Sequence, residues 1–150
     1  MTVWAAKGIL LTVFLMMAAA WDMKNREIPD FIPISIIAVG LIGITLSALP
    51  AAICGLIITA LPYFVAAVAV RRGSFAIGGG DIKLMAACGF VLGIWGGVLQ
   101  SMVSLTLVVI AGAVVAAVRK KKFSEVQIPL APCFCAGGIL SFMAVFAAAI

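Results

Sequence analysis

IKLMAACGFVLGIWGGVLQSMVSLTLVVIAGAVVAAV, residues 82–118, is an apolar run of 37 residues with a single charge, Lys83, near its start. A helix needs about 20 apolar residues to cross a bilayer, so one crossing cannot use the whole run. Gly93, Gly96 and Gly97 stand near its middle and predict a break there. The run therefore predicts two membrane helices joined by a bend, in a chain that folds in lipid.

The composition of the whole chain also indicates a membrane protein. Hydrophobic residues make up 66% of its 150 residues and charged residues only 10%, whereas a soluble domain carries roughly 25% charged residues. The apolar segments lack the alternation that membrane strands require. The sequence predicts an all-α membrane protein, with one polytopic domain over residues 1–150 and about six transmembrane helices. These run approximately over residues 4–21, 31–49, 51–70, 82–92, 95–118 and 129–150.

Basic residues gather on one side of this predicted arrangement. Nine of the ten follow the first, third and fifth spans, and Lys7 alone lies toward the other side. The nine are Lys24, Arg26, Arg71, Arg72, Lys83, Arg119, Lys120, Lys121 and Lys122. Because basic loops stay in the cytoplasm, we expect both termini outside and a multi-pass protein of the cytoplasmic (inner) membrane. The clusters lack the stripe and the aromatic interleaving of nucleic-acid binding, so no nucleic-acid partner is expected.

The N-terminal segment allows a second interpretation. Residues 1–22 contain Lys7, an apolar stretch and an Ala-rich end, as a secretory signal peptide does. Cleavage there would place Lys24 and Arg26 outside, against the charge distribution, so we interpret the segment as a first membrane helix. The four cysteines form no CxxC pattern and the chain has no histidine, so we expect no metal site.

All five acidic residues fall on the predicted cytoplasmic side. Asp22 ends the first predicted span and Asp81 opens the fourth, so both should lie at similar depth near the inner interface. Asp30 precedes a predicted helix and is expected to cap its N-terminus. Glu27 and Glu125 lie among basic loop residues and are expected to be solvated.

The residue types limit the chemistry. Without histidine, the chain cannot form a Ser–His or Cys–His nucleophile or an HExxH zinc site. A Ser–Lys dyad with Lys83 stays formally possible, although nothing places a serine beside it. Two nearby carboxylates in a low dielectric would share a proton, so Asp22 and Asp81 could activate water and protonate a carbonyl without a cofactor. The simpler alternative is that each aspartate only terminates or caps a helix.

Gly78, Gly79 and Gly80 directly precede Asp81. Peptide bonds inside a helix are hydrogen-bonded, so a membrane substrate must be unwound before it is hydrolysed. Glycine lets another backbone approach closely, and an extended substrate could pair with residues 78–80 like an added strand. A hinge or close helix packing would use the same glycines.

Three motifs together resemble a known family. GGGDIK, residues 78–83, resembles the GxGD motif of polytopic aspartyl proteases, in the GxGDxK form typical of type IV prepilin peptidases. DMKNREIPD, residues 22–30, resembles that family's first motif, an aspartate several residues before Ile-Pro. IPLAPCFCAGG, residues 128–138, resembles the start of the family's final helix, with Ala131 where glycine is common.

The resemblance implies a function and a site. Asp22 and Asp81 would be the catalytic pair, and Lys83 would hold substrate, pair with a carboxylate or extend to the interface. The substrate would be a prepilin or pseudopilin, cut at the cytoplasmic face between a short basic leader ending in glycine and the apolar helix. The compact chain is similar to the peptidases of tight-adherence (Flp-type) pilus systems, and archaeal preflagellin peptidases share its plan. Since it begins at its first span without paired CxxC motifs, we expect no N-methyltransferase activity.

Two other classes of function are considered. A small ion or proton carrier also uses intramembrane carboxylates, but it places them near the midplane and often contains an inverted repeat. The acids here lie toward one interface, and no repeat is evident. A non-catalytic subunit of a pilus or secretion assembly would use the aspartates only as helix ends, and would tolerate their replacement by asparagine.

Overall fold

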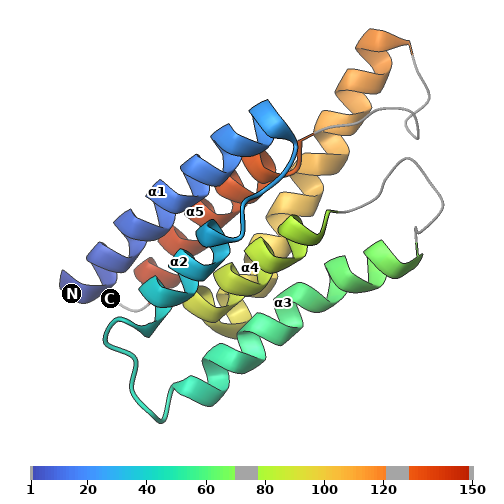
Figure 1. Cartoon of the computed structure of the whole chain (residues 1–150). Coiled ribbons are helices and arrows are strands. Elements are labelled where there is room, and N and C mark those ends of the chain that lie inside the picture. The colour runs from blue at the N-terminus through green and yellow to red at the C-terminus, as the bar shows by residue number, and fades with distance from the viewer. Residues whose placement is uncertain (1, 70–77, 121–128, 149–150) are drawn as a thin grey trace.

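The computed structural model describes residues 2–69, 78–120 and 129–148, which form a bundle of helices (Figure 1). The elements within these residues are α1 (Thr2–Asn25), α2 (Phe31–Leu41), α3 (Leu49–Ala69), α4 (Gly79–Arg119) and α5 (Ala131–Ala148). In lipid the backbone finds no water to bond with, so a helix, which pairs its own N–H and C=O groups, is favoured. The predicted all-α fold is confirmed.

The helices differ in their capacity to cross a membrane. Among the described residues, α1, α3, α4 and α5 are the four helices long and apolar enough to span one. Helix α2 has 11 residues. The predicted second span, 31–49, is therefore wrong at its end, because the helix stops at Leu41 and Gly43 follows with a φ of 64°. The count of six spans and the membrane sides of the termini stay predictions.

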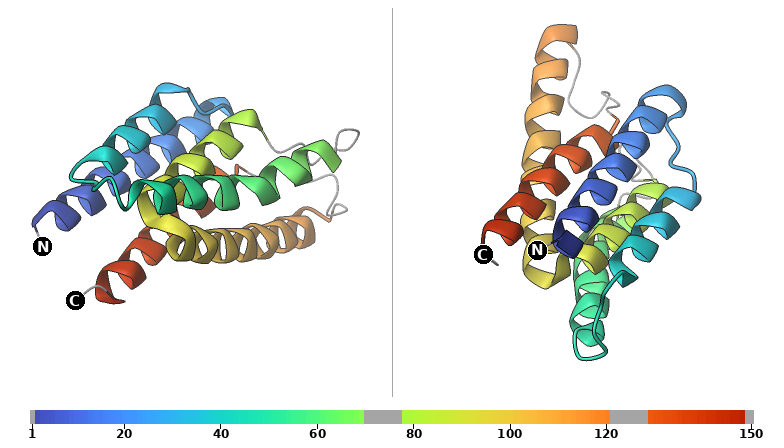
Figure 2. Two further views of the ribbon diagram at one scale, coloured as in Figure 1. Left: turned by 90° about the horizontal axis from the view of Figure 1, so that it is seen from below. Right: turned by 90° about the vertical axis from the view of Figure 1, so that its left-hand side faces the viewer.

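Helix α4 folds back on itself at Gly93, where φ is 69° and ψ is −171°. Beyond this break, the Gln100 side-chain nitrogen lies 3.8 Å from the sulfur of Met85, whereas 15 residues of straight helix would span about 22 Å. The two halves therefore pack against each other and run in opposite directions (Figure 2). The predicted break in the long apolar run is confirmed at Gly93.

Glycines bring α3 and α4 into close backbone contact. A Cβ built on Gly55 would meet the carbonyl oxygen of Gly89 and lie 2.8 Å from the carbonyl carbon of Gly93. A Cβ on Gly97 would meet the hydroxyl of Thr59. Small residues at such crossings let membrane helices approach and gain van der Waals contact. Gly97, which we expected to mark the break, instead serves this packing.

One end of the bundle collects the C-terminal ends of α1, α3 and α4 and the N-terminal ends of α4 and α5 (Figure 1). We call it the basic end, since it carries most of the described basic residues: Lys24, Arg26, Lys83, Arg119 and Lys120. At the other end, Lys7 donates a 3.1 Å hydrogen bond to the carbonyl of Gly40. The remaining basic residues, at 71–72 and 121–122, and Glu125 lie outside the described residues.

Candidate active site

Asp22 lies in the last two turns of α1, with 7% of its surface exposed. Its Oδ2 accepts a 3.0 Å hydrogen bond from the backbone N–H of Ala131, the first residue of α5. The first N–H groups of a helix have no partner within the helix, and a carboxylate there is also favoured by the helix dipole. This hydrogen bond orients the Asp22 carboxylate and joins the first helix to the last.

Asp81 lies in the first turn of α4, with 9% of its surface exposed. Its Oδ2 accepts a 3.2 Å hydrogen bond from the backbone N–H of Gly78. An acid that reaches back to the residue before the helix stabilises the helix start, so this carboxylate has a structural role of its own. The helix-capping alternative considered for Asp81 therefore describes part of what the residue does.

The two aspartates line a single cavity of about 440 Å³ at the basic end. Its walls come from the end of α1, the segment that follows α1, and the start of α4. The lining residues are Asp22, Arg26, Glu27, Ile28, Gly78, Gly79, Gly80 and Asp81. Five of the six predicted site residues thus come together, although the two aspartates stand on different helices and far apart in sequence.

The glycines differ from one another in conformation and surroundings. Gly78 is extended, with φ −67° and ψ 146°, but Gly79 and Gly80 already belong to α4. The expected extended edge over residues 78–80 is therefore limited to Gly78. A Cβ on Gly80 would lie 3.0 Å from the Cβ and 3.2 Å from the carbonyl oxygen of Ile28, whereas one on Gly79 would meet nothing within 4 Å. Gly80 is the position where two walls of the cavity touch.

Lys83, the sixth predicted site residue, is not among the residues that line the cavity. Its Nζ lies 2.7 Å from Oδ1 of Asp30, and the two side chains are 55% and 65% exposed. Three roles were considered for Lys83, and the structure shows the one in which the lysine pairs with a carboxylate, that of Asp30. The predicted capping role of Asp30 is wrong: it stands at the N-cap of α2 without a side-chain capping bond, because its carboxylate turns to the lysine.

Several cavity residues were not predicted. Arg26 has a positive φ of 56°, which turns the chain sharply after α1. Glu27 is exposed as expected, yet it lines the cavity. The role of Ala131 had a signal in the sequence: Pro129 and Pro132 have no N–H, so few donors remain at the start of α5.

The arrangement provides two buried carboxylates that share a cavity, each oriented by one backbone N–H group. Such a pair can hold a water molecule and a carbonyl group between them and can move a proton from one to the other. Within the described parts of the chain, no three Cys, Asp or Glu residues gather into a group able to hold a metal ion.

A family model described as the type IV leader peptidase family matches residues 9–118. The match spans more than half of the chain and contains both aspartates and the glycines of the cavity. The chain belongs to the type IV leader peptidase family. The resemblance seen in the sequence is thereby confirmed, and the protein is a peptidase with several apolar helices, as expected of a multi-pass membrane protein. No match was found among curated proteins or among solved structures.

Proposed function

We propose that this peptidase is an aspartyl endopeptidase that removes the leader from Flp-type prepilins at the cytoplasmic face of the inner membrane. The observation that carries the proposal is the pair of buried aspartates, Asp22 and Asp81, in one cavity at the basic end of the bundle. A basic end is the end that stays in the cytoplasm. The leader and the start of the pilin helix would meet the enzyme there.

In the proposed reaction the two carboxylates share one proton. The ionised aspartate takes a proton from water while the other donates its proton to the carbonyl oxygen of the scissile peptide, giving a tetrahedral intermediate. Proton transfer to the amide nitrogen then lets the C–N bond break, and no covalent enzyme intermediate forms. The backbone N–H groups of Ala131 and Gly78 hold the two side chains in orientation throughout.

The start of α4 offers contacts for the substrate backbone. Gly79 and Gly80 are its first two residues, and the first N–H groups of a helix lack partners within it. We propose that these N–H groups bind carbonyl groups of the unwound leader, in place of the strand pairing expected over residues 78–80. The backbone at Gly79 is open to a second chain, since even a Cβ there would meet nothing within 4 Å.

The proposal is tested by incubating the purified peptidase in lipid vesicles with an Flp-type prepilin and measuring product masses. We expect a single cut between the leader glycine and the apolar helix, with an unmethylated new N-terminus. Uncut prepilin under conditions where the peptidase stays folded would contradict the proposed function. A purified archaeal preflagellin is tested in parallel, and the cleavage rates of the two proteins distinguish the two substrate types.

Gly80→Ala is expected to slow cleavage by roughly tenfold, since misplacement of a catalytic group by about 1 Å can cost up to a hundredfold. The added methyl presses on Ile28 and displaces the start of α4, which carries Asp81. Gly79→Ala should lose less, because its methyl meets nothing within 4 Å. The measurement is the initial cleavage rate at equal amounts of folded protein. Equal losses in the two variants would count against the contact with Ile28 as the cause.

Lys83→Gln is expected to change the cleavage rate by less than about threefold and the free energy of unfolding by less than about 1 kcal/mol. Lys83 and Asp30 are more than half exposed, and exposed ion pairs contribute about 0–1 kcal/mol. Asp30→Asn should have an effect of the same size, because both variants remove the same pair. A large rise in KM for Lys83→Gln alone would show instead that the lysine holds substrate.

A further inference from the structure

Gln100 lies in the second half of α4, and its side chain is fully buried in the bundle. Its side-chain nitrogen donates a 3.3 Å hydrogen bond to the backbone carbonyl of Phe134 and lies 3.8 Å from the sulfur of Met85. Phe134 belongs to α5, and Met85 belongs to the first half of α4. One amide therefore joins the second half of α4 to two other segments of the bundle.

Each contact of this amide lies one helical turn from a residue that forms or anchors the carboxylate pair. Phe134 is three residues beyond Ala131, the donor to Asp22, and Met85 is four residues beyond Asp81 on the same face of α4. At 1.5 Å per residue, these separations are about 4.5 Å and 6 Å along the helices. The amide thus reaches the supports of both aspartates, although the second half of α4 contributes no residue to the lining of their cavity.

The stability of the bundle does not explain why an amide stands here. The side-chain oxygen of Gln100 is buried and has no hydrogen-bond partner among the described residues. A buried polar group without a partner costs free energy, which an apolar side chain of the same shape would avoid. Gly138 of α5 also makes room for the amide, since a Cβ built there would lie 3.0 Å from its nitrogen. The amide is therefore better explained by the positions that it holds.

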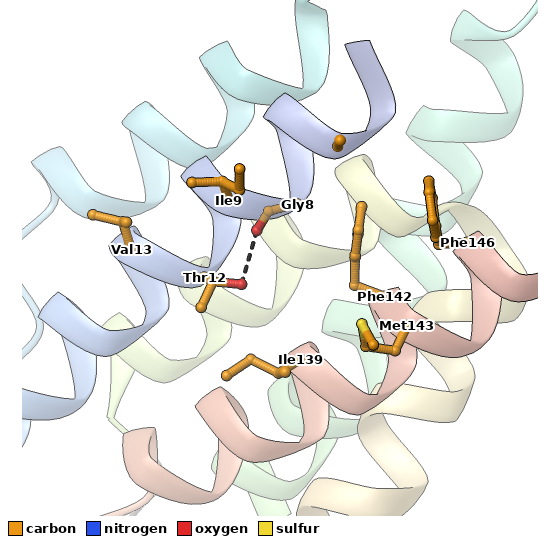
Figure 3. Close-up of a pocket in the computed structure, with 9 residues that line it drawn as sticks. Gly8, Ile9, Thr12, Val13, Ile139, Phe142, Met143 and Phe146 are labelled. Atoms are coloured by element: carbon orange, nitrogen blue, oxygen red, sulfur yellow. Dashed lines mark hydrogen bonds between the residues drawn. The ribbon is translucent and has the colours of Figure 1, made fainter. Parts of the chain in front are cut away.

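The packing of α1 against α5 does not by itself fix how far each helix lies along its axis. Gly8 of α1 packs against the ring of Phe142 of α5, and a cavity of about 360 Å³ leaves room between the two helices beside this contact (Figure 3). Apolar contacts are non-directional, whereas a hydrogen bond requires a defined distance and angle. The bond from Gln100 to Phe134 supplies such a constraint at the end of α5 that meets Asp22.

We propose that Gln100 is a positioning residue of the carboxylate pair. It sets the depth of the start of α5, and so the donor to Asp22, relative to the turn of α4 that carries Asp81. This rests on the proposed function, in which the two carboxylates act together on one water molecule. Gln100 is not among the residues that line the cavity, so its loss should slow the chemical step without weakening the binding of substrate.

Gln100→Met tests the positioning role, because methionine keeps the length of the side chain and removes its donors. We expect kcat for prepilin to fall about tenfold with KM unchanged, since misplacement by about 1 Å can cost up to a hundredfold. Gln100→Leu, a second apolar replacement of similar size, should behave in the same way. All rates are measured at equal amounts of folded protein.

Ser141→Ala is the matched control. Ser141 is as buried as Gln100, and its hydroxyl donates to the carbonyl of Gly96, so this variant removes another hydrogen bond between α5 and the second half of α4. That bond lies about 15 Å along α5 from Ala131, and its loss should leave kcat and KM unchanged. Equal falls in kcat for Gln100→Met and Ser141→Ala would overturn the positioning role, as would a raised KM with unchanged kcat for Gln100→Met.

Hydrogen exchange of the Ala131 backbone N–H, followed by NMR, tests the same role without a substrate. The exchange should be faster in Gln100→Met than in the unmodified peptidase and unchanged in Ser141→Ala, because only the first variant frees the start of α5. Unchanged exchange in Gln100→Met would overturn the positioning role. Failure of the unmodified peptidase to cut prepilin would instead overturn the proposed function.

Discussion

Asp22→Asn and Asp81→Asn are each expected to lower prepilin cleavage by at least about a thousandfold, within the range that acid–base groups contribute. Asparagine can neither take a proton from water nor donate one as an acid does. It keeps a side-chain oxygen, so the hydrogen bonds from the N–H groups of Ala131 and Gly78 can survive. The protein should therefore stay folded in the membrane, and a loss of activity reports on chemistry.

The measurement is the rate of prepilin cleavage at equal amounts of membrane-inserted protein. Asp30→Asn is the matched control, because Asp30 is exposed and pairs with Lys83 outside the cavity. The double variant Asp22→Asn/Asp81→Asn should be no slower than either single variant, since groups that act as a unit have non-additive effects. Cleavage at the normal rate by either single variant would show that the paired-carboxylate mechanism is wrong.

Gly55→Ala is expected to destabilise the bundle clearly. The added methyl would meet the backbone of Gly89 and Gly93, and backbone atoms cannot turn aside as a side chain can. Overpacking typically costs about 1–3 kcal/mol, and occasionally more, whereas alanine gains only about 1 kcal/mol over glycine in a helix. Because the contact is with backbone, we expect a steric cost at the top of that range, about 3 kcal/mol, and therefore a net loss of stability of about 2 kcal/mol.

The midpoint of thermal unfolding in detergent measures this effect. Gly79→Ala serves as the control, because its methyl lies in open space at the start of α4. We expect a clear fall in the midpoint for Gly55→Ala and little change for Gly79→Ala. A Gly55→Ala protein as stable as the original would show that α3 and α4 can separate at low cost.

The bend of α4 and the end of α2 show what the sequence can and cannot predict about the fold. The bend was predictable because an apolar run twice the thickness of a bilayer must turn, and Gly93 can adopt the positive φ that the turn needs. The end of α2 at Leu41 was not predictable from the sequence. Residues 42–49 include further apolar residues, which suggested that the helix continues, but an apolar residue can be buried in lipid without being helical.

The candidate site was predictable in its side chains but not in their hydrogen-bond partners. Asp22 and Asp81 stand out as acids at matched positions in an apolar chain. The donor from Ala131 is a backbone group, and the two prolines beside it indicate only that few donors remain at the start of α5, not which acid accepts from them. Asp30 had the position of a helix cap, but its partner Lys83 is 53 residues away in sequence. Such long-range pairings depend on how the helices pack, which periodicity does not determine.

The hydrogen bond from Ala131 to Asp22 has a consequence for biosynthesis. During translation α1 enters the membrane first and α5 last, so Asp22 is without its backbone donor until 109 further residues have been made. A nascent chain that already holds both aspartates still has the first of them unanchored. The carboxylate pair of the proposed mechanism therefore has both of its backbone donors only after the start of the last helix has been synthesised.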